Sequence, residues 1–287
     1  MTAIIKKEMK TYFNNMSGYV FLFFFVILTA AFFMMTNVLQ LNAEYYYTTI
    51  NSTMIFMVMI PMLTMRLFAE EYAQKTDQLL YTAPVPTASI VVGKYVSACT
   101  VLLIGMVITG IFPCLISPYA TLPLSRIIGT YVGFFLLGCS FISIGMLVSV
   151  MTNNQIIAAV ASFALIFVFY MADSVINIIP ATREAGILFV IIVGIILSFF
   201  LYNSTKNIGA GVGAFVIIAV ICAIVYATIP NVFDGLAVKS LKWVSLMSRF
   251  QNFSIGILDV ADIVYYITFS MLFNFFTVNV IEKRRWA

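Results

Sequence analysis

Long, uninterrupted apolar runs constrain this chain more than any other feature of its sequence. Each has roughly the 20 residues that an α-helix needs to cross the hydrocarbon core of a bilayer, and none alternates as a transmembrane β-strand does. Only 9% of the 287 residues are charged, against about 25% in a soluble domain. We therefore predict an all-α integral membrane protein with about eight transmembrane helices. The runs are Tyr19–Val38, Thr53–Phe68, Tyr95–Ile116, Ile127–Met151, Ile156–Ile179, Gly186–Tyr202, Ile208–Ile229 and Ile263–Ile281. The second and sixth are short, which leaves open that either is partly re-entrant.

The distribution of lysine and arginine predicts which side of the membrane each end faces. Eight spans place both termini on one side, and basic residues favour the cytoplasmic side. We predict cytoplasmic termini and a first span that is retained, because charged residues and no cleavage site precede it. The basic residues on the predicted inner side are Lys6, Lys7, Lys10, Arg66, Lys75, Lys94, Lys206, Lys283, Arg284 and Arg285. Those on the predicted outer side are fewer, namely Arg126, Arg183, Lys239, Lys242 and Arg249.

Three segments are too polar to be spans. In Met1–Met16, apolar residues recur at helical spacing opposite lysines, which predicts an amphipathic helix on the inner leaflet that ends near residue 17. Ala69–Gly93 is a polar cytoplasmic loop closed by Pro84 and Pro86. Pro230–Asp262 is an external loop, and its mixture of apolar and charged residues predicts helices at the outer interface.

The chain lacks the residues that several kinds of chemistry need. The chain has no histidine, which excludes His-based metal sites and general bases. Its four cysteines lie within or beside apolar runs, so we interpret them as packing residues. No Gly-x-x-x-x-Gly-Lys-Ser/Thr sequence occurs, and the chain therefore has no phosphate cradle for ATP. We predict no metal, no cofactor and no enzymatic activity in this chain, and a net charge of +4 gives no indication of nucleic acid binding.

Short motifs in the polar loop and at both ends of the chain follow one another in a recognisable order. They are Lys7-Glu8, Tyr12-Phe13, Glu70-Glu71, Thr76-Asp77, Leu79-Leu80, Thr82-Ala-Pro84-Val85, Gly93-Lys94 and Glu282-Lys-Arg-Arg285-Trp286. In this order they resemble the ABC-2 transporter permease family, particularly the branch of the gliding-motility export systems. The resemblance extends over most of the chain.

The resemblance implies a fold, a function and partners. The fold would be one permease domain over residues 1–287, with a six-span core, an N-terminal elbow helix at 1–17 and a coupling helix in the loop 69–93. The function would be ATP-driven export across the bacterial cytoplasmic membrane. A separate ABC ATP-binding subunit would hold the ATP and Mg, and a second permease copy, identical or related, would complete the transporter in the lipid. The substrate is left open.

Two features depart from the family pattern. Lys75 and Gln78 stand where the family has glycine and glutamate. A glycine permits a helix break or a close approach that we expect Lys75 not to permit. The hairpin 186–229 is also an addition to six spans, placed before the external loop 230–262.

The polar loop has the composition of a docking helix. Charged residues form one face, the leucines offer an apolar anchor, and the prolines end the helix. The alternative is an ordinary solvated loop, which composition alone would favour. With the resemblance, the residues predicted to couple to the ATPase are Glu70, Glu71, Lys75, Thr76, Asp77, Leu79 and Leu80.

A second set of residues could line a substrate path. Asp173 lies inside an apolar run, where an acid is costly and therefore a functional candidate, although it could instead reach the outer interface. Methionines of the second span fit irregular shapes, but they equally suit core packing, and an asparagine of the last span equally suits a hydrogen bond between helices. The candidates are Met57, Met62, Met65, Asp173 and Asn274.

Three other classes of membrane protein are alternatives to a permease. A structural or scaffold subunit of a transport complex is compatible with the same spans. A secondary carrier needs internal acids or a broken helix at mid-membrane, and only Asp173 comes near that requirement. An intramembrane enzyme needs paired acids or a nucleophile with a base, and the spans offer neither.

Overall fold

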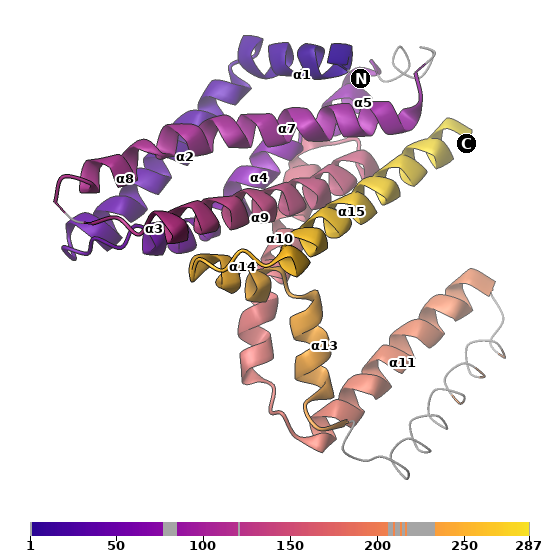
Figure 1. The fold of residues 1–287 in the computed structure, drawn as a ribbon. Coiled ribbons are helices and arrows are strands. Elements are labelled where there is room, and N and C mark those ends of the chain that lie inside the picture. Colours follow the sequence, from indigo (N-terminus) through magenta and orange to yellow (C-terminus); the bar gives the residue numbers. More distant parts are fainter. Residues whose placement is uncertain are drawn as a thin grey trace. The chain divides into compact units, whose positions relative to one another are not determined.

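The computed structural model describes residues 2–76, 85–119, 121–205 and 233–286, with the single residues Gly209, Gly213 and Val216. All regular secondary structure in these ranges is helical, which confirms the predicted fold class. The chain divides into two compact units (Figure 1). The main unit is Met1–Tyr170 with Leu246–Ala287, and the small unit is Met171–Ser245.

Six helical runs in the described part of the chain are long and apolar enough to cross a membrane. They confirm six of the predicted spans, with ends that differ by a few residues except in the second span and at the start of the third, which begins at Thr87 and not at Tyr95. The runs are α2 (Ser17–Phe33) with the π-helix Met34–Val38, the segmented run Tyr46–Gln74, α7 (Thr87–Thr109) with α8 (Ile111–Ile116), α9 (Leu124–Met151), α10 (Gln155–Ile178) and α15 (Val260–Trp286).

Of the two further predicted spans, the structure describes one as a helix and contains only single positions of the other. The sixth run corresponds to α11 (Arg183–Thr205), a helix of 23 residues in the small unit. The seventh, Ile208–Ile229, lies outside the described residues apart from three single positions. The hairpin 186–229 is therefore described only in its first helix.

The second span is longer than the apolar run Thr53–Phe68 that predicted it. It starts with α3 (Tyr46–Ser52), continues through a 3-10 turn and α4 (Phe56–Thr64), and ends in α5 (Ala69–Gln74). The sequence pattern missed α3 because it is polar, but the hydroxyl groups of Thr48 and Ser52 are buried and hydrogen-bonded. Thr48 hydrogen-bonds with Thr36 and Asn37 of α2's π-helical end, and Tyr45 pairs with Tyr131 at 3.0 Å.

Helix α9 is the centre of the main unit, and most of its residues are buried. It packs against α4, α7, α14 and α15. Small residues make this close packing possible. A Cβ added at Gly145 would lie 2.9 Å from the Cβ of Thr64, and one at Gly133 would lie 2.6 Å from the Cβ of Phe253. The sequence therefore uses glycine where α4 and α14 approach the α9 backbone.

The predicted external loop contains two helices in its described part. They are α13 (Leu236–Val244) in the small unit and α14 (Leu246–Ser254) in the main unit. Helix α14 is amphipathic and buries Phe250 and Phe253 against α9. The Tyr266 hydroxyl of α15 donates a hydrogen bond of 2.6 Å to the Leu246 carbonyl, which fixes the start of α14.

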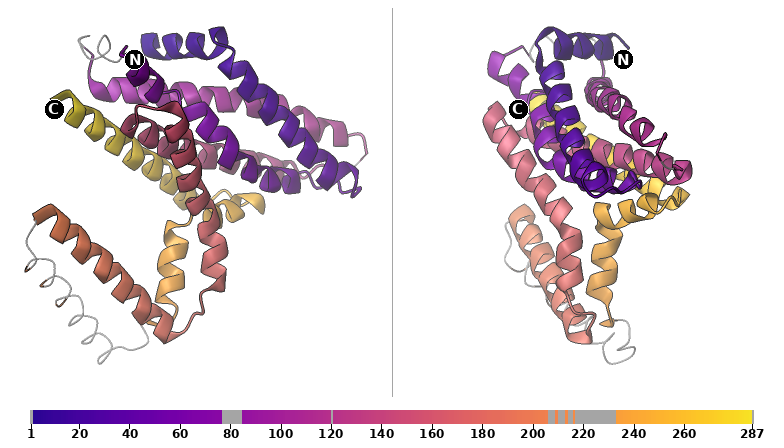
Figure 2. Two further views of the ribbon diagram at one scale, coloured as in Figure 1. Left: turned by 180° about the vertical axis from the view of Figure 1, so that it is seen from behind. Right: turned by 90° about the vertical axis from the view of Figure 1, so that its left-hand side faces the viewer.

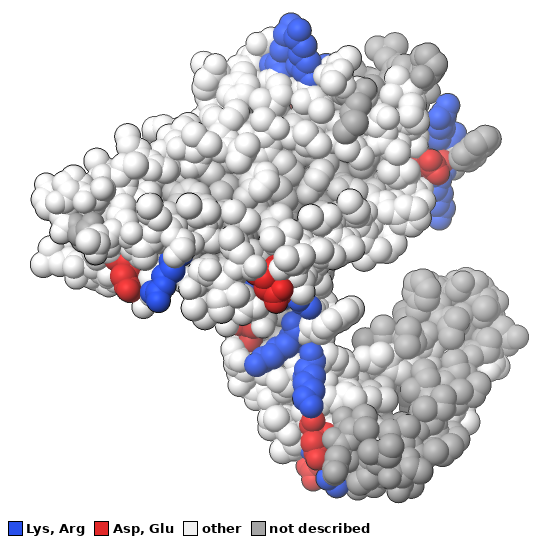
Figure 3. Space-filling model, in the orientation of Figure 1, with Lys and Arg blue, Asp and Glu red and all other residues white. Residues whose placement is uncertain are grey.

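Charged side chains of the main unit gather at its two ends, and a broad uncharged face separates them (Figure 3). Figures 1 and 2 show the N-terminus, α5 and the C-terminus near one end, which we call the α1 end after helix α1 (Thr2–Asn14). The other end carries the ion pairs Arg126–Glu44 at 3.9 Å and Arg249–Asp262 at 2.8 Å. This distribution is typical of a helical bundle that crosses a bilayer.

Candidate functional site: a buried charge cluster at the α1 end

Helix α1 is amphipathic as predicted, but its buried face is partly polar. Glu8 and Tyr12 are spaced i, i+4 and lie buried, while Lys6 and Lys10 are exposed. The Tyr12 hydroxyl donates a hydrogen bond of 3.3 Å to the Leu63 carbonyl of α4. Burial, with a smaller contribution from Glu8, raises the pKa of Tyr12 well above its usual value. This side chain is therefore a fixed hydrogen-bond donor between α1 and α4.

Lys94 of α7 is the centre of the site. Its side chain is 1% exposed, and its ammonium group lies 3.1 Å from a Glu8 carboxylate oxygen and 2.9 Å from one of Glu71. It also donates a hydrogen bond of 2.7 Å to the Leu67 carbonyl and lies 5.1 Å from the Phe68 ring centroid. An ammonium has three N–H donors, and three oxygen acceptors surround this one.

Lys7 completes the cluster from α1. Its ammonium lies 3.1 Å from Glu71 and 3.4 Å from Glu8. Burial acts to lower the pKa of Lys7, but the charges of Glu71 and Glu8 and hydrogen bonds to them outweigh it and raise this pKa. Two ammonium groups therefore face two carboxylates. We call Lys7, Glu8, Glu71 and Lys94 the charge cluster, and it joins α1, α5 and α7.

Helix α5 is also attached to two further helices. The Ser149 hydroxyl of α9 accepts hydrogen bonds of 3.2 Å from the backbone N–H groups of Phe68 and Ala69, where α5 begins. The guanidinium of Arg284 in α15 lies 4.6 Å from the Tyr72 ring centroid. Arg284 also donates to the Met151 carbonyl at the end of α9 at 3.1 Å. The short helix at the end of the second span thus contacts α1, α7, α9 and α15.

The end of α5 corrects one expectation from the sequence. Lys75 adopts a left-handed conformation with φ of 56°. Its N–H donates to the Tyr72 carbonyl at 3.2 Å, and the N–H of Thr76 donates to the Glu71 carbonyl at 3.0 Å. These two bonds form a Schellman motif, which usually places glycine at this position. The expectation that lysine would not permit the helix break is therefore wrong, because the two hydrogen bonds and the open surroundings hold Lys75 in the strained conformation.

Replacing Lys75 by glycine is expected to stabilise the chain by about 0.5 kcal/mol. Relief of left-handed strain of about 1–2 kcal/mol exceeds the added chain entropy of the unfolded state, about 0.5–1 kcal/mol. The thermal unfolding midpoint of the purified chain should rise by about 1 °C. Lys75→Ala is the matched control, since it removes the charge but keeps the Cβ. A gain of the same size in Lys75→Ala would show that the backbone is not the cause.

The predicted coupling residues fall into three groups: some lie in or beside the charge cluster, some are exposed, and others are outside the described residues. Glu71 is in the charge cluster, and Glu70 is half-buried and accepts a hydrogen bond of 3.4 Å from Gln74. Lys75 and Thr76 are exposed. Asp77, Leu79 and Leu80 lie outside the described residues.

Sequence reasoning did not assign the partners that make this site. Lys94 was noted only as part of a Gly-Lys motif, although a lysine beside an apolar span is itself a signal that a partner exists. Glu8 was grouped with an N-terminal motif, and Arg284 with the C-terminal one. No local spacing relates these three residues to α5, because their partners are distant in the chain.

A comparison with known families bears directly on this arrangement. Residues 36–185 match the model of the family described as ABC-2 family transporter protein. The matched segment comprises 150 of the 287 residues. The chain belongs to the ABC-2 transporter family. A comparison with curated proteins found no match.

Family membership gives the site its context. ABC-2 proteins are the membrane subunits of ABC transporters, so this chain is a multi-pass transport subunit. The segment that matches the ABC-2 family includes α5 and Lys94, whereas Lys7, Glu8 and Arg284 lie outside it. The charge cluster therefore connects the part of the chain that matches the family to the two terminal helices.

Four of the predicted path residues lie in the main unit of this ABC-2 chain, and one lies in the small unit. Met57 is buried in α4, while Met62 and Met65 are half-buried farther along the same span. Asp173 is half-buried on α10, within the small unit. Asn274 of α15 lines a pocket of the main unit, and none of the other four residues lines that pocket. The methionines therefore fit the packing interpretation, and their role in a path stays a prediction.

Proposed function

We propose that this chain is the permease subunit of an ATP-driven exporter in the bacterial cytoplasmic membrane. The α1 end faces the cytoplasm, so that both termini and α5 are on the inner side. The observation behind the proposal is the attachment of α5 to α1, α7, α9 and α15. A helix held in this way can pass a rigid-body displacement to several spans at once.

The basic residues support this orientation. Within the main unit, the α1 end contains most of the lysine and arginine residues, whereas Arg126 and Arg249 belong to the other end. Basic residues favour the cytoplasmic side of a bacterial membrane. An ATP-binding subunit would therefore meet the α1 end.

The proposed mechanism assigns a role to each partner. A separate ATP-binding subunit holds ATP and Mg and docks on α5 and the loop that follows it. Two permease copies, identical or related, stand side by side, each with one such subunit. Closure of the ATP-binding subunits displaces α5, and Lys94, Ser149 and Arg284 pass the displacement to α7, α9 and α15. The rearranged spans then open a path for the substrate toward the outside.

Co-purification with the ATP-binding subunit tests the proposal. Ala73 and Thr76 are exposed on and just after α5, so Ala73→Arg with Thr76→Arg should weaken binding at least tenfold and leave the permease folded. Tyr119→Arg is the matched control, because Tyr119 is 89% exposed in the loop after α8. Failure of the unmodified chain to bind the subunit, or equal loss in the control, would overturn the proposal.

A further inference from the structure

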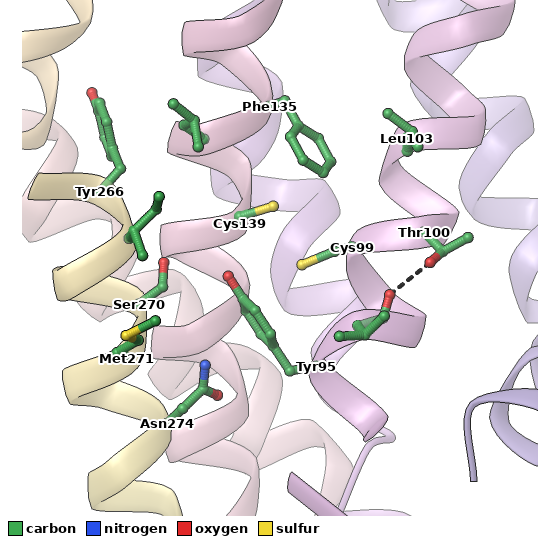
Figure 4. Close-up of a pocket in the computed structure, with 13 residues that line it drawn as sticks. Tyr95, Cys99, Thr100, Leu103, Phe135, Cys139, Tyr266, Ser270, Met271 and Asn274 are labelled. Carbon is green, nitrogen blue, oxygen red and sulfur yellow. Dashed lines mark hydrogen bonds between the residues drawn. The ribbon is translucent and has the colours of Figure 1, made fainter. Parts of the chain in front are cut away.

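A pocket of about 390 Å³ lies between α7, α9 and α15 in the main unit (Figure 4). Its volume is at the lower end of the range of about 300–1,000 Å³ for small-molecule sites. Most of its lining is apolar, including Leu103, Phe135 and Met271. Tyr95, Ser270 and Asn274 supply polar groups on the side nearer the α1 end.

One polar atom of this pocket lacks a partner in the described part of the chain. The Ser270 hydroxyl pairs with Ser140 at 3.2 Å, and that of Thr100 donates to the Val96 carbonyl at 2.7 Å. The side-chain oxygen of Asn274 is buried and has no hydrogen-bond partner. Buried acceptors are nearly always paired, because an unpaired one has lost its hydration without replacement. The Asn274 oxygen is therefore available as an acceptor for a donor from outside the described chain.

A second pocket continues the first one along α7 and α9. It has a volume of about 490 Å³ and shares Leu103, Phe135 and Leu136 with the first. Together they extend along α7 and α8 from Tyr95 to Pro113. At 1.5 Å per residue this is about 27 Å, close to the thickness of a bilayer core, about 30 Å. No acidic or basic side chain lines either pocket, so a charged ligand would find no counter-charge.

We propose that these two pockets form one groove that binds a neutral amphiphile with a single aliphatic chain. A hydroxyl or amide of the ligand donates a hydrogen bond to the Asn274 oxygen, and the chain lies along Leu103 and Phe135. A helix of a second copy would insert only the side chains of one face into the groove, and cross-linking at Met271 distinguishes it from the amphiphile. The proposal is independent of the ATP-binding subunit.

Photo-labelling of the full chain in nanodiscs tests this site. The probe is 1-hexadecanol with a diazirine on its chain, competed by unlabelled 1-hexadecanol or by its methyl ether, which lacks the donor. The alcohol should compete about fivefold better than the ether, as expected for one additional hydrogen bond. Asn274→Leu should remove this preference but retain labelling. Leu103→Trp should fill the groove and abolish labelling.

Controls separate the groove from general contact with lipid. Val168→Trp places the same bulk at an exposed position of α10, and labelling of the groove should not change. Equal competition by alcohol and ether, or the same preference in Asn274→Leu, would overturn the proposal. A benzophenone side chain at Met271 should label the alcohol; reaction with a second copy instead would show that a helix occupies the groove and would also overturn it. Loss of ATPase docking would leave these results unchanged.

Discussion

Replacement of Lys94 by methionine is expected to lower the thermal unfolding midpoint by roughly 6–10 °C. The substitution keeps most of the side-chain volume but leaves Glu8 and Glu71 beside an apolar group. Removing one partner from a buried ion pair costs about 3–5 kcal/mol, and each kcal/mol shifts the midpoint of a chain of this size by about 2 °C. The shift is measured by following unfolding of the detergent-solubilised protein.

A charge-neutral variant is the control for this prediction. Combining Lys94→Met with Glu8→Gln leaves one ammonium, Lys7, beside one carboxylate, Glu71, and at least half of the lost stability should return. Lys7→Met should have a small effect, about 0–1 kcal/mol, because its side chain is 54% exposed. A Lys94→Met variant as stable as the unmodified chain would show that the charge cluster contributes nothing to the fold.

The substitution Glu71→Gln is expected to uncouple transport from ATP hydrolysis, given the proposed function. In α5, Glu71 contacts lysines of both α1 and α7. The neutral amide of glutamine retains the shape but lacks the negative charge that forms the two ion pairs. In the reconstituted complex, transport should fall at least tenfold while ATP hydrolysis falls less than twofold. Both rates are measured on the same proteoliposomes.

Glu70→Gln is a close control because it makes the same chemical change one residue earlier. The carboxylate of Glu70 accepts its hydrogen bond within α5, from Gln74, so transport should stay within twofold of the unmodified complex. Equal losses of transport and hydrolysis in Glu71→Gln would indicate that docking, and not coupling, has failed. A tenfold loss in Glu70→Gln would contradict the assignment of coupling to the charge cluster.

Apolar runs predicted the positions of most helices, because a bilayer requires them to be continuous. The pattern failed at Tyr46–Ser52, where the Thr48 hydroxyl is hydrogen-bonded inside the protein and so tolerates burial. Thr36 and Asn37 supply the partners from a different helix. The pattern cannot distinguish such a paired polar segment from a loop, since the pairing depends on tertiary contacts.

The candidate site was predictable only in part. The family motifs located Glu71, but the sequence separation of 86 residues between Glu8 and Lys94 prevented their pairing from being predicted. At Lys75 a prediction from residue type alone was wrong. A lysine is unsuited to a left-handed conformation, but Lys75 adopts it. Local preference is overridden there by two backbone hydrogen bonds at the end of α5.

The position of Lys94 in the chain has a consequence for biosynthesis. Its contacts, Glu8, Leu67, Phe68 and Glu71, all precede it in the sequence, so the ribosome has made every one of them before α7 emerges. A lysine that enters a membrane without a partner is costly. When α7 enters the bilayer, its counter-charges are therefore already present on the nascent chain.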